Sequence, residues 1–180
     1  SAGGVTYHNN HDELGWKVTL TDTGARSMTG ARIARIKDFV QGEDFMLTYG
    51  DGVSDIDISK LVTFHKDHGK LVTLTSIQTP GRYGNIEMDN NGLVDHFVEK
   101  PEGDGMWING GFFVLEPEVK NYIHADMEPF ESGALPRMVT DLNLSSYHHS
   151  DFWQPMDTLR EKQELSKFAL AGNPPWLRGI

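Results

Sequence analysis

The sequence predicts an α/β fold built around a short buried strand, an acidic glycine turn and a helix. The apolar run Phe45–Leu47 has the length of a strand, and Gly50-Asp51-Gly52 follows it as a turn in which backbone can approach a ligand closely. The next stretch, 58–67, carries apolar residues at helical spacing. Because open α/β sheets bind ligands at the carboxyl ends of their strands, Asp51 is the first candidate site residue.

Length and composition indicate one ordinary globular domain spanning residues 1–180, with 38% hydrophobic and 23% charged residues. The formal net charge of -10 argues against binding to nucleic acid or to an anionic membrane through general electrostatics. The sequence contains no cysteine, which excludes disulfides and thiolate chemistry and fits a cytoplasmic location. No apolar run approaches the length of a membrane span.

The N-terminal part predicts a strand followed by a loop and a helix. Trp16–Asp22 alternates and is rich in β-branched residues, which is typical of a strand, and Ala31–Val40 shows helical spacing. Ser27 or Thr29 is expected to cap that helix. Arg32 then stands in the first turn, where the helix dipole disfavours a cation, so it is either kept for an anion or simply exposed and solubilising.

The middle of the chain predicts strands and a hairpin. Lys70–Ile77 alternates as a strand does. Asn85–Met88 and Leu93–Val98 flank an Asn-Gly dipeptide, which is the strongest local signal for a hairpin. A further strand, Met106–Leu115, is interrupted by Asn109-Gly110-Gly111, and paired glycines inside a strand indicate a bulge or a close approach to a ligand.

The C-terminal part predicts helices from Pro117 to about Ile123 and over Ser132–Asp141, and a short strand over Leu144–Tyr147. A last helix is expected over Leu159–Leu170. Asp157 stands at its N-terminus, where an aspartate is commonly an N-cap. From local pattern alone, a cap and a ligand for a metal both remain open for this carboxylate.

Four stretches stand in the chain in an order known from one enzyme family: Thr48-Tyr49-Gly50-Asp51-Gly52-Val53, Glu99-Lys100-Pro101, Ile108-Asn109-Gly110-Gly111-Phe112-Phe113 and Phe152-Trp153-Gln154-Pro155-Met156-Asp157-Thr158. Together they resemble the sugar-phosphate nucleotidylyltransferases, and most of all the glucose-1-phosphate cytidylyltransferases within that family. The resemblance implies a Rossmann-like fold with a mixed, mainly parallel sheet. It also implies the reaction of CTP with glucose 1-phosphate to give CDP-glucose and pyrophosphate, which serves lipopolysaccharide O-antigen biosynthesis in bacteria.

The resemblance also implies roles for individual residues. The expected catalytic and metal-binding residues, which would hold Mg²⁺, are Asp51 and Asp157. The expected nucleotide contacts are Ser27, Arg32 and Gly50. The expected contacts to the sugar phosphate are Glu99, Lys100, Asn109 and Gly110. Physical chemistry agrees, because nucleotidyl transfer mainly needs positioned phosphates and cations, and Mg²⁺ suits two carboxylates together with phosphate oxygens and water.

The sequence departs from the family in one respect. Its members carry a glycine-rich Gly-Gly-x-Gly-Thr-Arg-Leu loop and a Lys-Pro-Lys-Pro stretch, and neither occurs here. We therefore expect an N-terminally truncated domain with little or no turnover alone, or a non-catalytic sugar-nucleotide-binding or assembly module. We also expect the strand at Phe45–Thr48 to lie at a sheet edge and to favour a homo-oligomer. The edge would pair with another chain, exchange strands with it, or be covered by the chain's own segment Val5–Leu14.

Other metal sites are less well supported by the sequence. A calcium loop starting at Asp51 is rejected, because its twelfth position is Val62 where such a loop needs a bidentate Glu. A zinc site is not expected either: His65 and His68 share a helix and His148-His149 end a strand, but no third ligand is evident. These histidines are expected at the surface.

Overall fold

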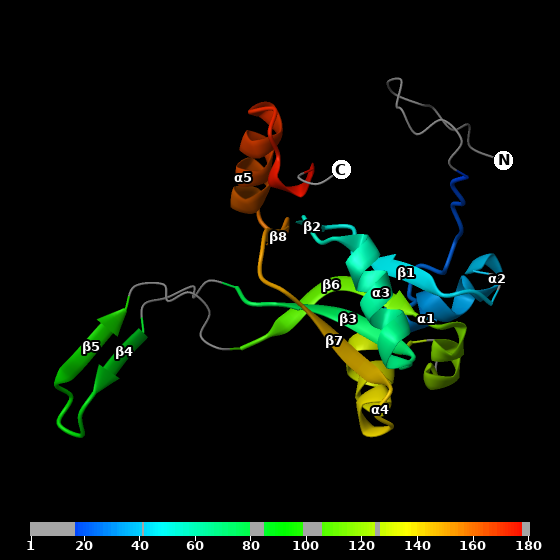
Figure 1. The fold of residues 1–180 in the computed structure, drawn as a ribbon, viewed down its shortest axis with the longest axis horizontal. Coiled ribbons are helices and arrows are strands. Elements are labelled where there is room, and N and C mark those ends of the chain that lie inside the picture. Colours follow the sequence, from blue (N-terminus) through cyan, green and yellow to red (C-terminus); the bar gives the residue numbers. More distant parts are fainter. Residues whose placement is uncertain (1–16, 41, 80–84, 99–105, 125–126, 178–180) are drawn as a thin grey trace.

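A four-stranded sheet lies at the centre of the computed structural model, which describes residues 17–40, 42–79, 85–98, 106–124 and 127–177 (Figure 1). Its strand order is β1-β6-β3-β7. The bounds are β1 Phe45–Thr48, β3 Val72–Ile77, β6 Ile108–Leu115 and β7 Leu144–His149. β6 is antiparallel to both β1 and β3, whereas β3 and β7 are parallel.

The predicted α/β fold with a mixed sheet is therefore confirmed. Parallel pairing is less extensive than "mainly parallel" implies, because β6 reverses the direction on both of its sides. β1 is the outer strand on its side of this sheet within the described part of the chain, as the sequence predicts for Phe45–Thr48.

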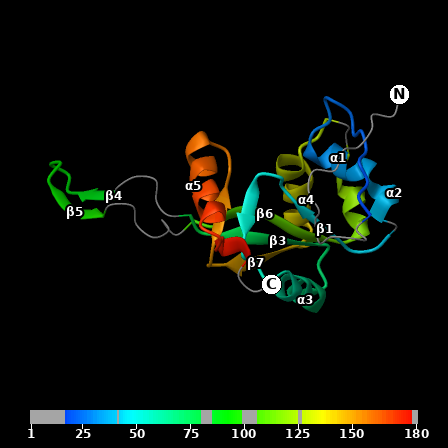
Figure 2. The same cartoon turned by 90° about the horizontal axis from the view of Figure 1, so that it is seen from above.

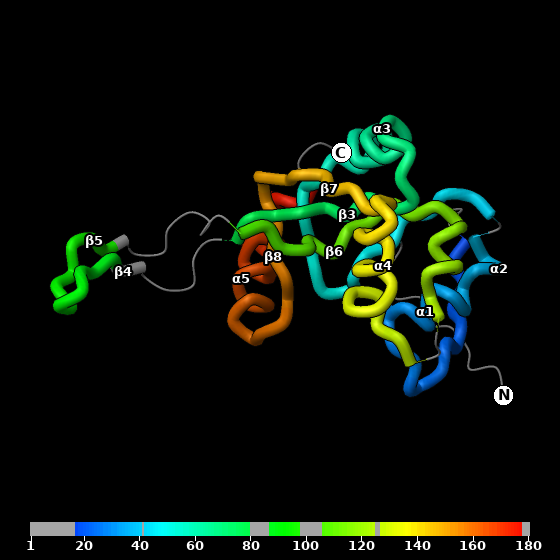
Figure 3. The backbone as a smooth tube through the Cα atoms, turned by 90° about the horizontal axis from the view of Figure 1, so that it is seen from below, coloured from blue at the N-terminus to red at the C-terminus, as the bar shows by residue number. Residues whose placement is uncertain are grey.

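Helices cover both faces of the sheet, as the views from above and below show (Figures 2 and 3). α3 (Ile58–His68) lies on one face; α1 (Thr29–Arg35) and α4 (Leu135–Thr140) lie on the other. α3 begins where the Asp57 carboxylate accepts the N–H of Lys60 at 3.0 Å. The prediction of a helix over 58–67 is thus confirmed.

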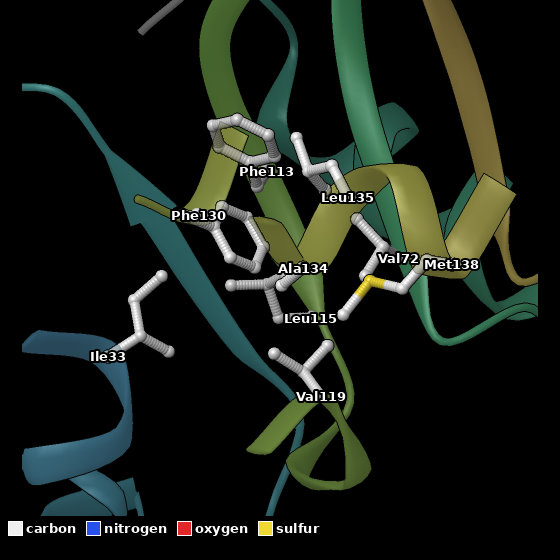
Figure 4. Close-up of a cluster of buried hydrophobic side chains, with 9 residues drawn as sticks. All are labelled: Ile33, Val72, Phe113, Leu115, Val119, Phe130, Ala134, Leu135 and Met138. Atoms are coloured by element: carbon white, nitrogen blue, oxygen red, sulfur yellow. The ribbon is translucent and has the colours of Figure 1, made fainter. Parts of the chain in front are cut away.

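The main core lies between the sheet and the two helices α1 and α4 (Figure 4). Its largest fully buried members are Phe113 and Phe130, whose ring centroids lie 5.9 Å apart. The other buried members are Ile33, Val72, Leu115, Val119, Ala134, Leu135 and Met138. Because side chains alternate along β6, Val114 faces the opposite side and packs with Leu61 of α3 in a smaller cluster.

The strand predicted over 16–22 is wrong for residues 17–22, the part that the structure describes. These residues form no regular structure, and Val18 and Leu20 are 74% and 84% exposed. Alternation of apolar and polar residues is not sufficient for a strand, which also needs a neighbouring strand to pair with and a core to cover.

The helix predicted over 31–40 is two helices, α1 and α2 (Lys37–Val40). Its predicted cap is also wrong, because the N-cap is Met28 and no side chain caps it. The hydroxyl of Ser27 donates to the carbonyl of Thr23 at 2.5 Å, and that of Thr29 donates to Glu131 at 2.7 Å. The Ser27 contact is local and the Thr29 contact is tertiary, and neither caps the helix.

The predicted hairpin is confirmed as β4 (Asn85–Met88) and β5 (Val94–Val98), which are antiparallel and project away from the sheet (Figures 1 and 2). The helix predicted after Glu116 is the 3-10 helix η1 (Pro117–Tyr122). The helix predicted over 132–141 begins two residues earlier as a π-helical segment, Phe130–Ala134, which continues into α4.

Two short strands were not predicted. β2 (Gly52–Ser54) and β8 (Trp153–Pro155) pair antiparallel, and α5 (Leu159–Leu170) follows β8. The 3-10 helix η3 (Pro175–Leu177) ends the described chain. No helix in the described ranges is both long and apolar enough to cross a membrane.

Candidate active site

The β2–β8 pair brings Asp51 and Asp157 to one pocket. Gly52 of β2 is opposite Pro155 of β8, and the N–H of Met156 donates to the carbonyl of Asp51 at 2.6 Å. Asp51 directly precedes β2 and Asp157 closely follows β8, so both face a pocket of about 210 Å³ at the carboxyl end of β1. The remaining wall comes mainly from β1 and β6 and includes Tyr49, Asn109, Gly110 and Gly111.

The predicted bulge in β6 shapes this wall. The register between β3 and β6 shifts there, and Gly111 has a φ of +79°, which favours glycine. A Cβ on Gly111 would lie 2.6 Å from Cδ2 of Tyr49, so the absent side chain makes room for the tyrosine ring. The indole N–H of Trp153 donates to the carbonyl of Gly110 at 2.7 Å and joins β8 to the bulge.

Asp157 does not cap α5. The N-cap is Thr158, whose hydroxyl oxygen accepts the N–H of Glu161 at 3.2 Å, while the Glu161 carboxylate accepts the N–H of Thr158 at 2.8 Å. This capping box satisfies the helix end. Of the two interpretations that the sequence left open, the cap is excluded. Neither the Asp157 nor the Asp51 carboxylate has a hydrogen bond or ion pair among the residues that the structure describes.

A second pocket of about 400 Å³ adjoins the first and shares Thr48, Tyr49 and Asp51 with it. Arg32 and Gly50 line it together with Asp51, so these candidate residues do lie close together. The guanidinium of Arg32 donates to the hydroxyl of Thr23 at 2.5 Å. Ser27 does not line either pocket; it is buried, and its hydroxyl also accepts from Arg35 at 2.6 Å.

A hydrogen-bonded network between the two pockets was missed by the sequence interpretation. The Tyr49 hydroxyl donates to Glu131 at 2.5 Å and accepts from the amide of Asn109 at 3.2 Å. Burial, reinforced by the Glu131 carboxylate, raises the pKa of Tyr49 above its usual range. Burial alone would raise the pKa of Glu131, but the hydrogen bonds from Tyr49 and Thr29 outweigh it and hold the pKa below its ordinary value. No local pattern links residues so distant in sequence.

Two of the expected substrate contacts, Glu99 and Lys100, lie outside the described residues. The expectation of surface histidines is wrong for His65 and His149, which are only 2% and 7% exposed. Each is held inside by tertiary contacts that a sequence does not display. His148 is exposed, as expected, and stacks on Trp107 with ring centroids 4.4 Å apart.

His149 lies near a serine and an aspartate, but the arrangement does not fit a nucleophilic triad. Its Nε2 lies 3.1 Å from the Ser54 hydroxyl, 3.1 Å from the carbonyl of Phe152 and 3.1 Å from the Asp55 carboxylate. A triad uses one ring nitrogen for the serine and the other for the carboxylate. The His149 group is therefore not an activated nucleophile. The chemical groups that the candidate site offers are the two open carboxylates of Asp51 and Asp157.

The family model and the curated relatives that this chain matches all describe nucleotidyl transferases. A nucleotidyl transferase family model matches residues 7–160. The glucose-1-phosphate cytidylyltransferase of Salmonella typhimurium is 47% identical over 162 residues, which cover 89% of this chain and 63% of that protein. A mannose-1-phosphate guanylyltransferase catalytic subunit beta of Drosophila pseudoobscura pseudoobscura is 28% identical over 157 residues, which cover 82% of this chain and 42% of that protein.

The fold has relatives among solved structures as well. The crystal structure of HddC from Yersinia pseudotuberculosis complexed with GMP-PN superimposes with a TM-score of 0.56 at 18% identity, over 76% of this chain and 60% of that chain. At this identity the likeness concerns the fold alone. The chain spans less than two thirds of the length of the Salmonella protein.

Proposed function

The chain belongs to the nucleotidyl transferase family, and from that premise we propose that its pocket at the carboxyl end of β1 serves cytidylyl transfer. The reaction joins CTP and glucose 1-phosphate to give CDP-glucose and pyrophosphate, a step toward the O-antigen sugars of bacterial lipopolysaccharide. The observation that carries the proposal is the meeting of Asp51 and Asp157, from turns far apart in the sequence, in one pocket.

The pocket fits Mg²⁺ by the chemistry of its donors. Two carboxylates face it, neither is used by the capping box of α5, and hard oxygen donors are what Mg²⁺ prefers. We assign Asp51 and Asp157 as the residues that hold the ion. When bound, the ion would offset negative charge on the phosphates.

The surrounding residues suit positioning, which is the main demand of this chemistry. In the transfer, a phosphate oxygen of the sugar phosphate bonds to the α-phosphorus of CTP, and the bond from that phosphorus to pyrophosphate breaks. Arg32 and Gly50, in the adjoining pocket, are assigned to the nucleotide. Asn109 and Gly110, which line the same pocket as Asp51 and Asp157, are assigned to the sugar phosphate, together with Glu99 and Lys100.

Ligand binding tests the assignment without requiring turnover. Calorimetry should detect CDP-glucose binding in MgCl₂ and weaker binding of GDP-mannose. Asn109→Ala and Arg32→Gln should each weaken CDP-glucose binding, whereas Arg160→Gln, an exposed arginine on α5, should leave it unchanged. Equal binding of both nucleotide sugars, or no binding at all, would overturn the assignment of the cytidylyl substrate.

Turnover by these 180 residues alone is proposed to be absent or slow, since the glycine-rich loop motif that positions a triphosphate does not occur in them. Pyrophosphate release from CTP and glucose 1-phosphate measures this. Rapid release that Asp51→Asn abolishes would contradict the proposed slowness and support catalysis. CDP-glucose binding with no release would favour the non-catalytic binding module.

A homo-oligomer is part of the same proposal. β1 is the outer strand of the described sheet, and Met46 on it is 60% exposed. An apolar outer strand invites pairing with another chain. Light scattering should report a species larger than a monomer, and Met46→Lys should shift it toward the monomer. A monomer at all concentrations would contradict this.

A further inference from the structure

A second cluster of carboxylates lies at the opposite end of β1. Asp44 directly precedes β1, and Glu116 directly follows β6. Since Phe45 pairs with Leu115 in the antiparallel ladder, Asp44 and Glu116 are opposite each other at its end. Alternation places both side chains on the face of Val114, which is the face that α3 covers.

α3 supplies a histidine to this cluster. One ring nitrogen of His65 and one carboxylate oxygen each of Asp44 and Glu116 all lie within 4.8 Å of one another. His65 is only 2% exposed, and its Nδ1 lies 2.8 Å from the hydroxyl of Thr73. Its Nε2 is buried and has no hydrogen-bond partner in the described structure. A buried polar atom without a partner is costly, and the imidazole that carries this one lies beside two acidic side chains.

The contacts behind His65 leave that nitrogen available as a ligand. The N–H of Lys70 donates to Nδ1 of His68 at 2.9 Å, so the hydrogen of His68 is on Nε2, which lies 2.7 Å from the Thr73 hydroxyl. The Thr73 oxygen has two lone pairs and can accept from both imidazoles, and metal binding would select this arrangement, in which Nδ1 of His65 carries its hydrogen. In that tautomer the lone pair of His65 is on Nε2. Metal-binding histidines are typically oriented by such a hydrogen bond from the other ring nitrogen.

We propose that Asp44, His65 and Glu116 form a binding site for a divalent transition metal, with zinc as the best match. A buried imidazole favours zinc over Mg²⁺, and three protein ligands with water in the fourth position are a common zinc arrangement. Ligand atoms around a tetrahedral zinc lie about 3.4 Å apart. The site therefore closes by small side-chain movements, and Asp44 is exposed and can make them.

The bound metal would join three elements that are distant in sequence: the start of β1, the end of β6 and the middle of α3. It would also neutralise two carboxylates that face each other across the ladder. The site is separate from Asp51, which follows β1 at its other end, and from Asp157, which follows β8.

The test is zinc binding by the full chain after removal of metal with a chelator. A chromophoric zinc indicator reports affinity, with MgCl₂ in excess so that oxygen-only sites hold Mg²⁺. Asp44→Asn and Glu116→Gln should each weaken zinc binding by at least about tenfold. The matched controls Glu43→Gln and Glu118→Gln remove an equal charge from exposed neighbours and should bind as the unmodified chain does.

X-ray absorption supplies a second readout that a general effect on folding does not change. The bound zinc should show nitrogen and oxygen ligands only, with one imidazole, and ZnCl₂ at 100 times the Kd should shift the unfolding equilibrium about 100-fold toward the folded state. Absence of zinc binding would overturn the proposal. Equal zinc binding by all four variants would also overturn it, because the metal would then be held by other residues.

Discussion

The two ends of β1 carry acidic clusters that differ in burial and in donor type. At the carboxyl end, Asp51 and Asp157 are exposed and face an open pocket whose wall is rich in glycine backbone. At the other end, Asp44 and Glu116 lie beside the buried imidazole of His65.

This difference indicates different tasks. Exposed carboxylates in an open pocket suit a hydrated, exchangeable ion that arrives and leaves with phosphate ligands. A buried imidazole oriented from behind by Thr73 suits a metal that stays and joins elements of the fold. Mutations that affect only one end of β1 therefore test this difference.

The largest expected effect on the pocket end comes from Gly111→Ala. The new methyl group meets both a φ of +79° and the ring of Tyr49, so we expect a loss of unfolding free energy on the order of 2–3 kcal/mol, measured by urea denaturation. Gly42→Ala is the control, because Gly42 has a φ of +80° but a methyl group there would meet no atom within 4 Å. Equal losses for both variants would show that the contact with Tyr49 costs nothing.

A smaller effect is expected from Tyr49→Phe, which removes one of the two hydroxyl donors, Tyr49 and Thr29, to the half-buried Glu131 carboxylate. We expect a loss of about 1–2 kcal/mol near neutral pH, from the same denaturation measurement. Because the folded-state pKa of Glu131 is depressed, its contribution is present above the unfolded-state pKa of about 4.3 and is lost as pH falls through the folded-state value. The difference between the two proteins should therefore shrink in acid; a difference that stays constant from pH 7 to pH 3 would contradict the role of Glu131.

The smallest effect on stability is expected from Asp157→Asn, since Thr158 rather than Asp157 caps α5. Thermal unfolding should show Thr158→Ala losing about 1 kcal/mol, whereas Asp157→Asn should change stability by less than about 0.5 kcal/mol. A loss for Asp157→Asn as large as that for Thr158→Ala would assign the aspartate a role in folding the helix instead of a role in binding.

Local patterns predicted the parts of the fold that local physics determines. The apolar run at Phe45–Leu47, the Asn-Gly hairpin and the paired glycines of β6 each appear in the structure as expected. The strand expected at 16–22 failed over its described residues because alternation says nothing about a pairing partner.

The site was predictable only in part. Motif order identified Asp51 and Asp157 as candidates, and β2 and β8, which bring them together, were too short to recognise from sequence. Ser27 failed to reach the pocket because its hydroxyl is engaged by Thr23 and Arg35. Contacts between residues distant in sequence, such as that of Tyr49 with Glu131, have no local signal at all.

The measurement that tests the central claim most directly is Mn²⁺ binding by electron paramagnetic resonance, with Mn²⁺ standing in for Mg²⁺. It is made in a Glu116→Gln background, so that the other end of β1 does not contribute. Adding Asp51→Asn or Asp157→Asn should weaken Mn²⁺ binding by at least about tenfold, while adding Asp151→Asn, an exposed aspartate outside this pocket, should not. Equal Mn²⁺ binding by all three double variants would contradict a metal site formed by Asp51 and Asp157.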